Sequence, residues 1–147
     1  KKFNLRHENG CRTDSIPLNG GADFHADGGV RLAEAYGMDP TIAEHLNRAY
    51  GDQARSVVEV GEEGFGSTLV EGHPYLEADV LWAVRHEMAC RAMDVLARRT
   101  PLALLDKAAA ASAADRTIDI MAKELSWDSD RCREEKQLVH ERLTSAI

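Results

Sequence analysis

Two neighbouring arginines have the clearest chemical potential in this sequence. Arg98 and Arg99 stand directly before Thr100, and Pro101 follows. Two guanidinium groups side by side can clamp a phosphate or a carboxylate through paired hydrogen bonds. At the end of a helix they can instead complement the helix dipole and pair with nearby acids such as Asp94 or Asp106. From the residues alone we favour the second interpretation, in which Arg98, Arg99 and Thr100 form an ordinary helix end.

Other chemical motifs fail on spacing. His86 and Cys90 have the outline of a zinc-binding H-E-x-x-H helix, but no third ligand follows at a sensible position. A calcium loop opening at Asp128 would place an arginine where its turn glycine belongs. The glycine-rich segment 61–66 follows no strand and precedes no Lys-Ser/Thr pair, so we expect a turn there. The sequence therefore predicts no catalytic, cofactor-binding or metal-binding residue in this chain.

The elements that position these residues show helical patterns. An apolar pattern begins at Gly28 and leads to Tyr36 before a glycine. Asp39 and Pro40 are typical of a helix N-cap and first position, and Gly51 indicates the end of that helix. We expect a short third helix over residues 52–60.

The strongest helical pattern runs from Leu76 toward Arg99. Apolar residues recur every three or four positions, which predicts one buried stripe along a single helix. Its members are Leu81, Val84, Met88, Ala92 and Val95. Pro101 forbids a smooth continuation, so we expect the helix to end at residues 98–100.

Two more helices are predicted in the last third of the chain. The first has apolar residues at steps of three and four, namely Ala111, Ala114, Ile118, Met121 and Leu125. Residues 126–130 interrupt it with capping residues, and a last helix contains Val139 and Leu143. Strand signals are limited to residues 57–58 and 68–70, too short for a sheet. We therefore predict an all-α, compact irregular bundle of six or seven helices.

Composition limits the function classes. The 147 residues have a formal net charge of −7, which argues against nucleic-acid binding. Cys11, Cys90 and Cys132 cannot all pair within the chain, so a reducing compartment is the simpler expectation. No apolar run approaches the roughly 20 residues of a membrane-spanning helix.

Residues 1–26 are polar and turn-prone, and the first residue is Lys1. We expect a linker at 1–26, cut from a longer chain, and one helical domain over 27–147.

Three segments together resemble the C-terminal domain of FAD-dependent glycerol-3-phosphate dehydrogenases. They are residues 75–80, residues 83–90 and residues 94–103, which begin with the Asp-Val-Leu-Ala-Arg-Arg-Thr turn. The similarity continues upstream at Leu46, residues 50–52 and Ala54, and downstream at residues 121–128. Residues 17–21 are similar to the linker of that family. The Arg-Arg-Thr block is its most specific portion.

The resemblance implies a function for the full-length protein. Such enzymes oxidise sn-glycerol 3-phosphate to dihydroxyacetone phosphate, reduce bound FAD and pass the electrons to membrane quinone. It implies that the FAD and substrate sites lie in a larger upstream flavin domain, and that this chain is a helical cap packed against it. Arg98, Arg99 and Thr100 are then expected to anchor the cap, and the chain alone to bind no FAD and have no turnover.

The resemblance also implies a location, and two alternatives stay open. The expected place is the mitochondrial inner membrane in a eukaryote, or the cytoplasmic face of the inner membrane in a bacterium, and a homodimer is left open. One alternative is a free-standing helical adaptor that binds another protein. The other is the cap of a related glycerol-3-phosphate oxidase, which passes electrons to oxygen.

Overall fold

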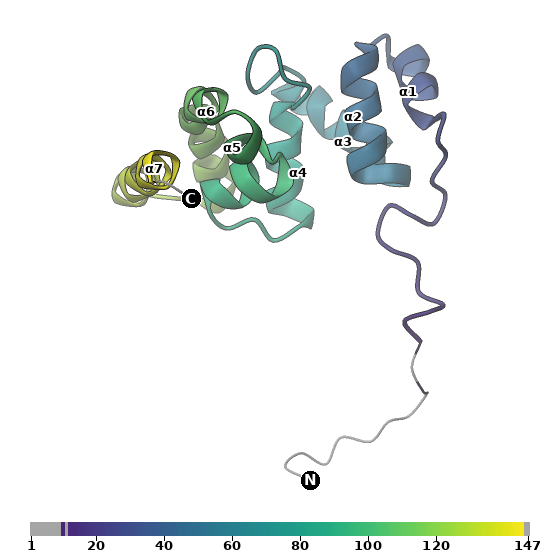
Figure 1. The fold of residues 1–147 in the computed structure, drawn as a ribbon, viewed down its shortest axis with the longest axis horizontal. Helices are drawn as coiled ribbons and strands as arrows, with labels where there is room; N and C mark the ends of the chain where they lie inside the picture. The colour runs from purple at the N-terminus through teal and green to yellow at the C-terminus, as the bar shows by residue number, and fades with distance from the viewer. Residues whose placement is uncertain (1–9, 11, 146–147) are drawn as a thin grey trace.

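Helices form almost all of the regular structure. The computed structural model describes residues 10 and 12–145, and within them the chain has seven α-helices and no β-strand (Figure 1). Thr68 and Leu76 form an isolated antiparallel bridge. The prediction of an all-α bundle of six or seven helices is confirmed. The α-helices are α1 (Gly28–Tyr36), α2 (Pro40–Tyr50), α3 (Ala54–Val60), α4 (Glu77–His86), α5 (Leu102–Leu105), α6 (Lys107–Leu125) and α7 (Ser129–Thr144).

Three short turns of tighter or wider helix join these elements. They are η1 (Gly51–Gln53), a 3-10 turn, and two π-helical turns, η2 (Gly61–Phe65) and η3 (Asp94–Arg99). The third short helix predicted at 52–60 is thus split into η1 and α3. The π-helical turn η3 contains both arginines singled out in the sequence, and π-turns are frequent at functional sites.

The helices follow one another across the molecule. Figure 1 shows α1 and α2 at one end, α4 in the middle and α6 and α7 at the other end. The central helix α4 contacts both α3 and α6, so residues 75–83 are all buried. Apolar side chains from every α-helix join one core, which closes among the described residues.

Aspartates start three of the helices. The Asp39 side chain accepts a hydrogen bond from Thr41 N at 2.7 Å, and Pro40 occupies the first position of α2 as predicted. Asp106 accepts one from Ala109 N at 2.9 Å, and Asp128 accepts one from Arg131 N at 2.8 Å. These bonds satisfy backbone donors that a helix start leaves without partners.

The prediction of one helix from Leu76 to Arg99 is wrong. Helix α4 ends at His86, and Met88 takes a left-handed backbone with φ 59°. The Met88 side chain is 87% exposed, whereas the predicted apolar stripe included it in the core. The other stripe residues are buried as predicted, except that Val84 is only half-buried; the buried ones are Leu81, Ala92 and Val95. The chain can break here because other side chains accept the freed backbone N–H groups. Asp94 accepts from Cys90 N and Arg91 N, and Glu135 accepts from Ala92 N.

The N-terminal segment is fastened to the end of α2. Asp52 N donates to Gly20 O at 3.0 Å, and Asp23 N donates to the Asp52 carboxylate at 3.0 Å. Gly20 and Gly51 lie so close that a Cβ on Gly51 would come 1.8 Å from Gly20 O. Residues 1–9 and Cys11 of the linker predicted at 1–26 lie outside the described residues. Asn19, Gly20 and Asp23 are hydrogen-bonded to residues 52–53, directly after α2.

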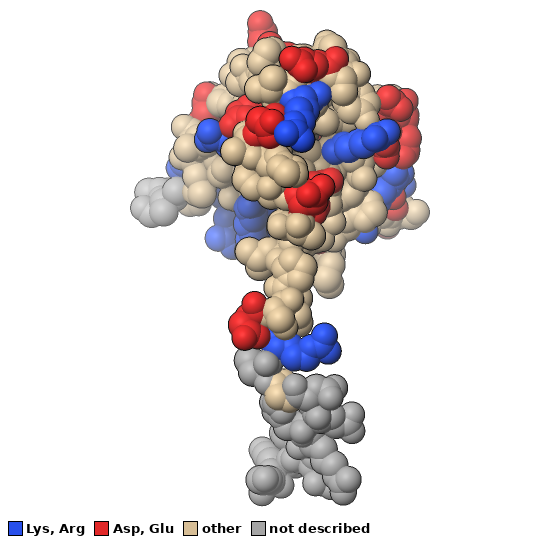
Figure 2. Space-filling view, turned by 90° about the vertical axis from the view of Figure 1, so that its right-hand side faces the viewer, with Lys and Arg blue, Asp and Glu red and all other residues tan. Residues whose placement is uncertain are grey.

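Charges on the α1–α2 face are mixed. Figure 2 shows arginine or lysine groups beside acidic groups on this face. The pairs include Arg31 with Asp27 and Arg48 with Glu44, each one helical turn apart. Among the described residues, no helix is long and apolar enough to cross a membrane.

Candidate docking site

Thr100 ends the turn that contains the two arginines. Its side chain is fully buried, and its Oγ1 and backbone N both donate to Val95 O, at 3.0 and 2.9 Å. The predicted helix end ahead of Pro101 is confirmed, because η3 stops at Arg99. Thr100 therefore fixes the backbone from which Arg98 and Arg99 project.

Arg98 has a weak and replaceable partner. Its guanidinium donates to Asp94 Oδ1 at 2.9 Å, one helical turn earlier, and its side chain is 77% exposed. This is the pairing that the sequence suggested. An exposed pair of this type contributes about 0.2–1 kcal/mol, so a partner surface can compete for Arg98 at little cost.

Arg99 is fixed on the loop that follows α4. Its Nη2 donates to Glu87 O at 2.8 Å, and its Nε lies 3.2 Å from Glu87 Oε2. The sequence suggested Asp94 or Asp106 instead. Asp106 caps α6 and lies 3.4 Å from His73 Nε2. Because one guanidinium holds both a carbonyl and a carboxylate of Glu87, Arg99 ties η3 to residues 87–91.

A charged hollow of about 370 Å³ lies beside these residues. Glu135 is buried at its edge and accepts from Arg91 Nε at 3.0 Å, while Arg131 Nη2 lies 2.8 Å away. Arg98 and Arg142 line the same hollow. The sequence does not reveal this role of Glu135, because Arg91 and Ala92, which donate to it, lie more than forty residues away and its position on α7 shows no distinguishing pattern.

The His86–Cys90 motif is separated by the helix break. The His86 ring packs against Trp82, with ring centroids 4.0 Å apart, whereas Cys90 lies in the following loop and donates to Met88 O. Within residues 10 and 12–145, no three histidine, cysteine or acidic side chains gather so as to hold a metal ion. Cys90 and Cys132 are free thiols.

A buried carboxylate connects α4 to α2. Asp79 is fully buried and accepts hydrogen bonds from Leu76 N at 2.7 Å and Tyr50 Oη at 2.5 Å. His45 Nε2 lies 2.9 Å away. Burial, reinforced by the Asp79 charge, raises the pKa of the Tyr50 phenol. The sequence signal was an acidic residue in the first turn of a helix, which reaches back to the helix start.

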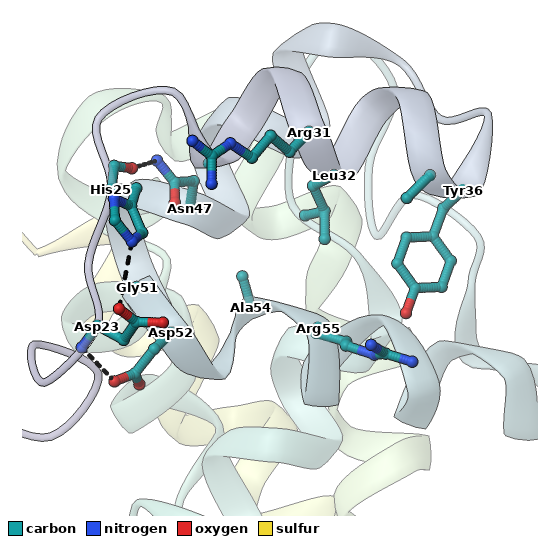
Figure 3. Close-up of a pocket in the computed structure, with 12 residues that line it drawn as sticks. Asp23, His25, Arg31, Leu32, Tyr36, Asn47, Gly51, Asp52, Ala54 and Arg55 are labelled. Carbon is teal, nitrogen blue, oxygen red and sulfur yellow. Dashed lines mark hydrogen bonds and ion pairs between the residues drawn. The ribbon is translucent and has the colours of Figure 1, made fainter.

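A second cavity, of about 480 Å³, lies between the N-terminal segment and helices α1, α2 and α3 (Figure 3). Its polar groups are already paired with one another or with adjacent residues. His25 Nε2 lies 3.2 Å from Asp23 Oδ1, Asn47 Nδ2 donates to His25 O at 3.1 Å, and Arg31 pairs with Asp27. These contacts join residues 23–25 to the helices.

Residues 11–132 match the sequence family described as the C-terminal domain of alpha-glycerophosphate oxidase. The chain belongs to this family. Curated proteins extend the relationship, and this chain is a C-terminal domain of the glycerol-3-phosphate dehydrogenase family. It is 40% identical over 135 residues to a probable mitochondrial glycerol-3-phosphate dehydrogenase of Dictyostelium discoideum, covering 91% of this chain and 21% of that protein.

Plant and animal relatives agree. The chain is 38% identical over 156 residues to a mitochondrial glycerol-3-phosphate dehydrogenase of Arabidopsis thaliana, covering 96% of this chain and 25% of that protein. With the mouse mitochondrial enzyme it shares 36% identity over 140 residues, covering 91% of this chain and 19% of the mouse protein. No solved structure matches. The chain therefore spans about a fifth to a quarter of the length of these relatives.

Proposed function

We propose that the full-length protein is an FAD-dependent glycerol-3-phosphate dehydrogenase and that this chain is its non-catalytic C-terminal cap. The observation that supports this is the 36–40% identity to named glycerol-3-phosphate dehydrogenases over at least 91% of the chain. The reaction is oxidation of sn-glycerol 3-phosphate to dihydroxyacetone phosphate. Family membership favours this assignment over a free-standing adaptor.

The described residues do not fit FAD. A dinucleotide-binding turn needs a strand, a glycine-rich loop and a helix whose N-terminus faces the pyrophosphate. The glycine-rich segment here follows helix α3 and exposes Glu62 and Glu63, whose negative charges oppose a phosphate. We therefore assign FAD and substrate to the upstream flavin domain and derive no chemical step in these residues.

The role of this chain is then to dock on the flavin domain. Arg98 and Arg99 are the proposed contacts or anion-holding groups, and Thr100 fixes the turn that presents them. The exposure of Arg98 and the hydrogen bond from Arg99 to Glu87 O support this role. A homodimer is compatible with the same domain.

Quinone is the proposed electron acceptor, and the mitochondrial inner membrane is the proposed location in a eukaryote. The location is supported by relatives that are mitochondrial in plants, animals and Dictyostelium. In a bacterium the corresponding place is the cytoplasmic face of the inner membrane. The family name includes an oxidase, so transfer to oxygen is the competing chemistry. Hydrogen peroxide released in step with glycerol 3-phosphate consumption would favour the oxidase.

The test compares the full-length protein with the 147-residue chain. We expect the full-length protein to be yellow and to reduce a quinone analogue when glycerol 3-phosphate is added. We expect the chain alone to be colourless and inactive under the same conditions. Flavin absorbance that stays with the purified chain would contradict the proposal, as would a full-length protein that does not oxidise glycerol 3-phosphate.

A further inference from the structure

Met88 is an apolar side chain displayed on a strained backbone. It is 87% exposed, the largest exposure among the large apolar side chains in the part of the chain that the structure describes. Its φ of 59° lies in the left-handed region, which residues other than glycine, asparagine and aspartate rarely adopt. Such strain persists only where the surrounding structure imposes it, and it clusters at functional sites.

The surrounding structure does impose it. We define loop 87–91 as residues Glu87–Arg91, between α4 and the residues that lead into η3. On one side, Arg99 donates to Glu87 O at 2.8 Å; on the other, Asp94 Oδ2 accepts from Cys90 N at 3.1 Å and Arg91 N at 3.0 Å. Ala89 N, next to Met88, donates to Ala83 O at 3.0 Å. The loop is thus held from both ends.

Burial of the neighbouring residues makes the loop rigid. Ala89 is 3% exposed and Ala92 is fully buried, so the chain is anchored in the core directly after Met88. A rigid loop loses little backbone entropy when a partner covers it. Methionine suits such a contact because its flexible thioether adapts to an irregular apolar pocket.

The charges around Met88 do not oppose a partner. Glu87 is paired with Arg99, and Asp94 with Arg98, so two of the acids flanking the apolar side chain are neutralised within the domain. Methionine and arginine are both enriched in the cores of protein interfaces, where acidic residues and lysine are depleted.

We propose that Met88 is the apolar anchor by which this domain docks on the upstream part of the full-length protein, with Arg99 as the positioning residue that holds loop 87–91. This rests on the proposed function. The occupant follows from length: the relatives are four to five times longer than the part matched here, so most of each protein lies outside these residues and is available as a partner.

Oxidation of methionine by dilute hydrogen peroxide, followed by mass spectrometry, measures the exposure of each side chain. The full-length protein is compared with the 147-residue chain, whose core closes on itself. In the chain alone, Met88 is expected to oxidise fastest and the fully buried Met121 slowest. In the full-length protein, we expect Met88 oxidation to slow severalfold while Met121 is unchanged. Equal Met88 rates in the two proteins would overturn the proposal.

Hydrogen exchange on the same two proteins distinguishes the two levels of the argument. Protection of other parts of the domain in the full-length protein, with Met88 still freely oxidised, would reject the anchor and keep the docking role. No protection anywhere in residues 12–145 would reject both.

Two substitutions separate docking from folding. Met88→Gly deletes the side chain and suits the positive φ, so the melting temperature of the chain alone should hold or rise. In the full-length protein the same variant should speed hydrogen exchange in loop 87–91. Leu105→Asp, at a side chain 71% exposed on α5, is the control and should not change that exchange. A Met88→Gly protein whose exchange equals that of the unaltered full-length protein would contradict the anchor.

The positioning role of Arg99 has its own readout. In the full-length protein, Arg99→Ala should speed Met88 oxidation while leaving Met121 unchanged, and Arg99→Lys should restore part of the protection by donating to Glu87. An Arg99→Ala protein with unaltered Met88 oxidation would remove Arg99 from the proposal.

Discussion

At the scale of single residues, one buried carboxylate holds more of the fold than either arginine. Asp79 accepts hydrogen bonds from the start of α4 and from Tyr50 at the end of α2, and it contacts His45 within α2. A buried donor without an acceptor costs more than a hydrogen bond contributes. The junction of α2 and α4 therefore depends on the charge and size of this one side chain.

Replacing Asp79 should be much more damaging than replacing one of its partners. Asp79→Ala leaves the donors of Leu76 and Tyr50 without acceptors, and we expect a loss of roughly 3 kcal/mol or more in the free energy of unfolding. Tyr50→Phe removes a single bond and should cost about 1–2 kcal/mol. Urea unfolding measures both, with the exposed Glu34→Ala as control. Similar losses for Asp79→Ala and Glu34→Ala would contradict this account.

The Arg85–Glu124 ion pair predicts how stability responds to acid. Hydrogen bonds from Arg85 lower the pKa of Glu124, which links α4 to the end of α6. A lowered pKa in the folded state stabilises the fold above the unfolded value, about 4.3, and this contribution is lost as pH falls through the folded value. The free energy of unfolding should therefore decline below about pH 4.3. Glu124→Gln should flatten that decline, and an unchanged pH profile would contradict the assignment.

At the scale of elements, the sequence predicted helix starts better than helix breaks. Asp39 and Pro40 predicted the start of α2 correctly, because a helix cap is an interaction between residues close in sequence. The break after His86 was not visible, because the apolar spacing at Met88 continues without interruption. The carboxylates that accept the backbone N–H groups freed by the break include those of Asp94, three residues after Arg91, and Glu135, more than forty residues after Ala92 on α7. Spacing cannot reveal such a long-range partner.

The same reasoning explains the candidate docking site. The composition of residues 98–101 predicted a helix end, and the Arg98–Asp94 pair followed from helical spacing. The Arg99–Glu87 contact did not, because it depends on a loop where a continuous helix was expected. A site that spans a break can be recognised from sequence only by its residue types.

The contact between the N-terminal segment and α2 requires glycine at its centre. Gly51 has φ 58° and ψ −125°, and a Cβ there would come 1.8 Å from Gly20 O. Gly37 has φ 62° but open space around it. We therefore expect Gly37→Ala to cost about 1 kcal/mol from backbone strain and Gly51→Ala to cost clearly more. Urea unfolding compares the two, and protease cleavage near residue 19 should accelerate only in Gly51→Ala. Equal losses would show that the close contact is unimportant.

At the scale of the whole molecule, the chain combines a closed core with a displayed surface. The core is complete among the described helices, while Arg98 and Met88 are largely exposed on adjoining elements. A net charge of −7 supplies no general attraction to anionic surfaces. This arrangement suits a domain that folds by itself and acts as part of a longer enzyme.

Replacing Arg99 in the full-length protein tests that account most directly. The measurements are the KM for glycerol 3-phosphate and the thermal unfolding midpoint of full-length Arg99→Ala. The control is Arg133→Ala, at an exposed position on α7. We predict a lower thermal midpoint with an unchanged KM for Arg99→Ala, because its guanidinium holds loop 87–91 for docking, and no change in either value for Arg133→Ala. An unchanged midpoint with a sharply raised KM would make Arg99 a substrate clamp and would contradict the docking role.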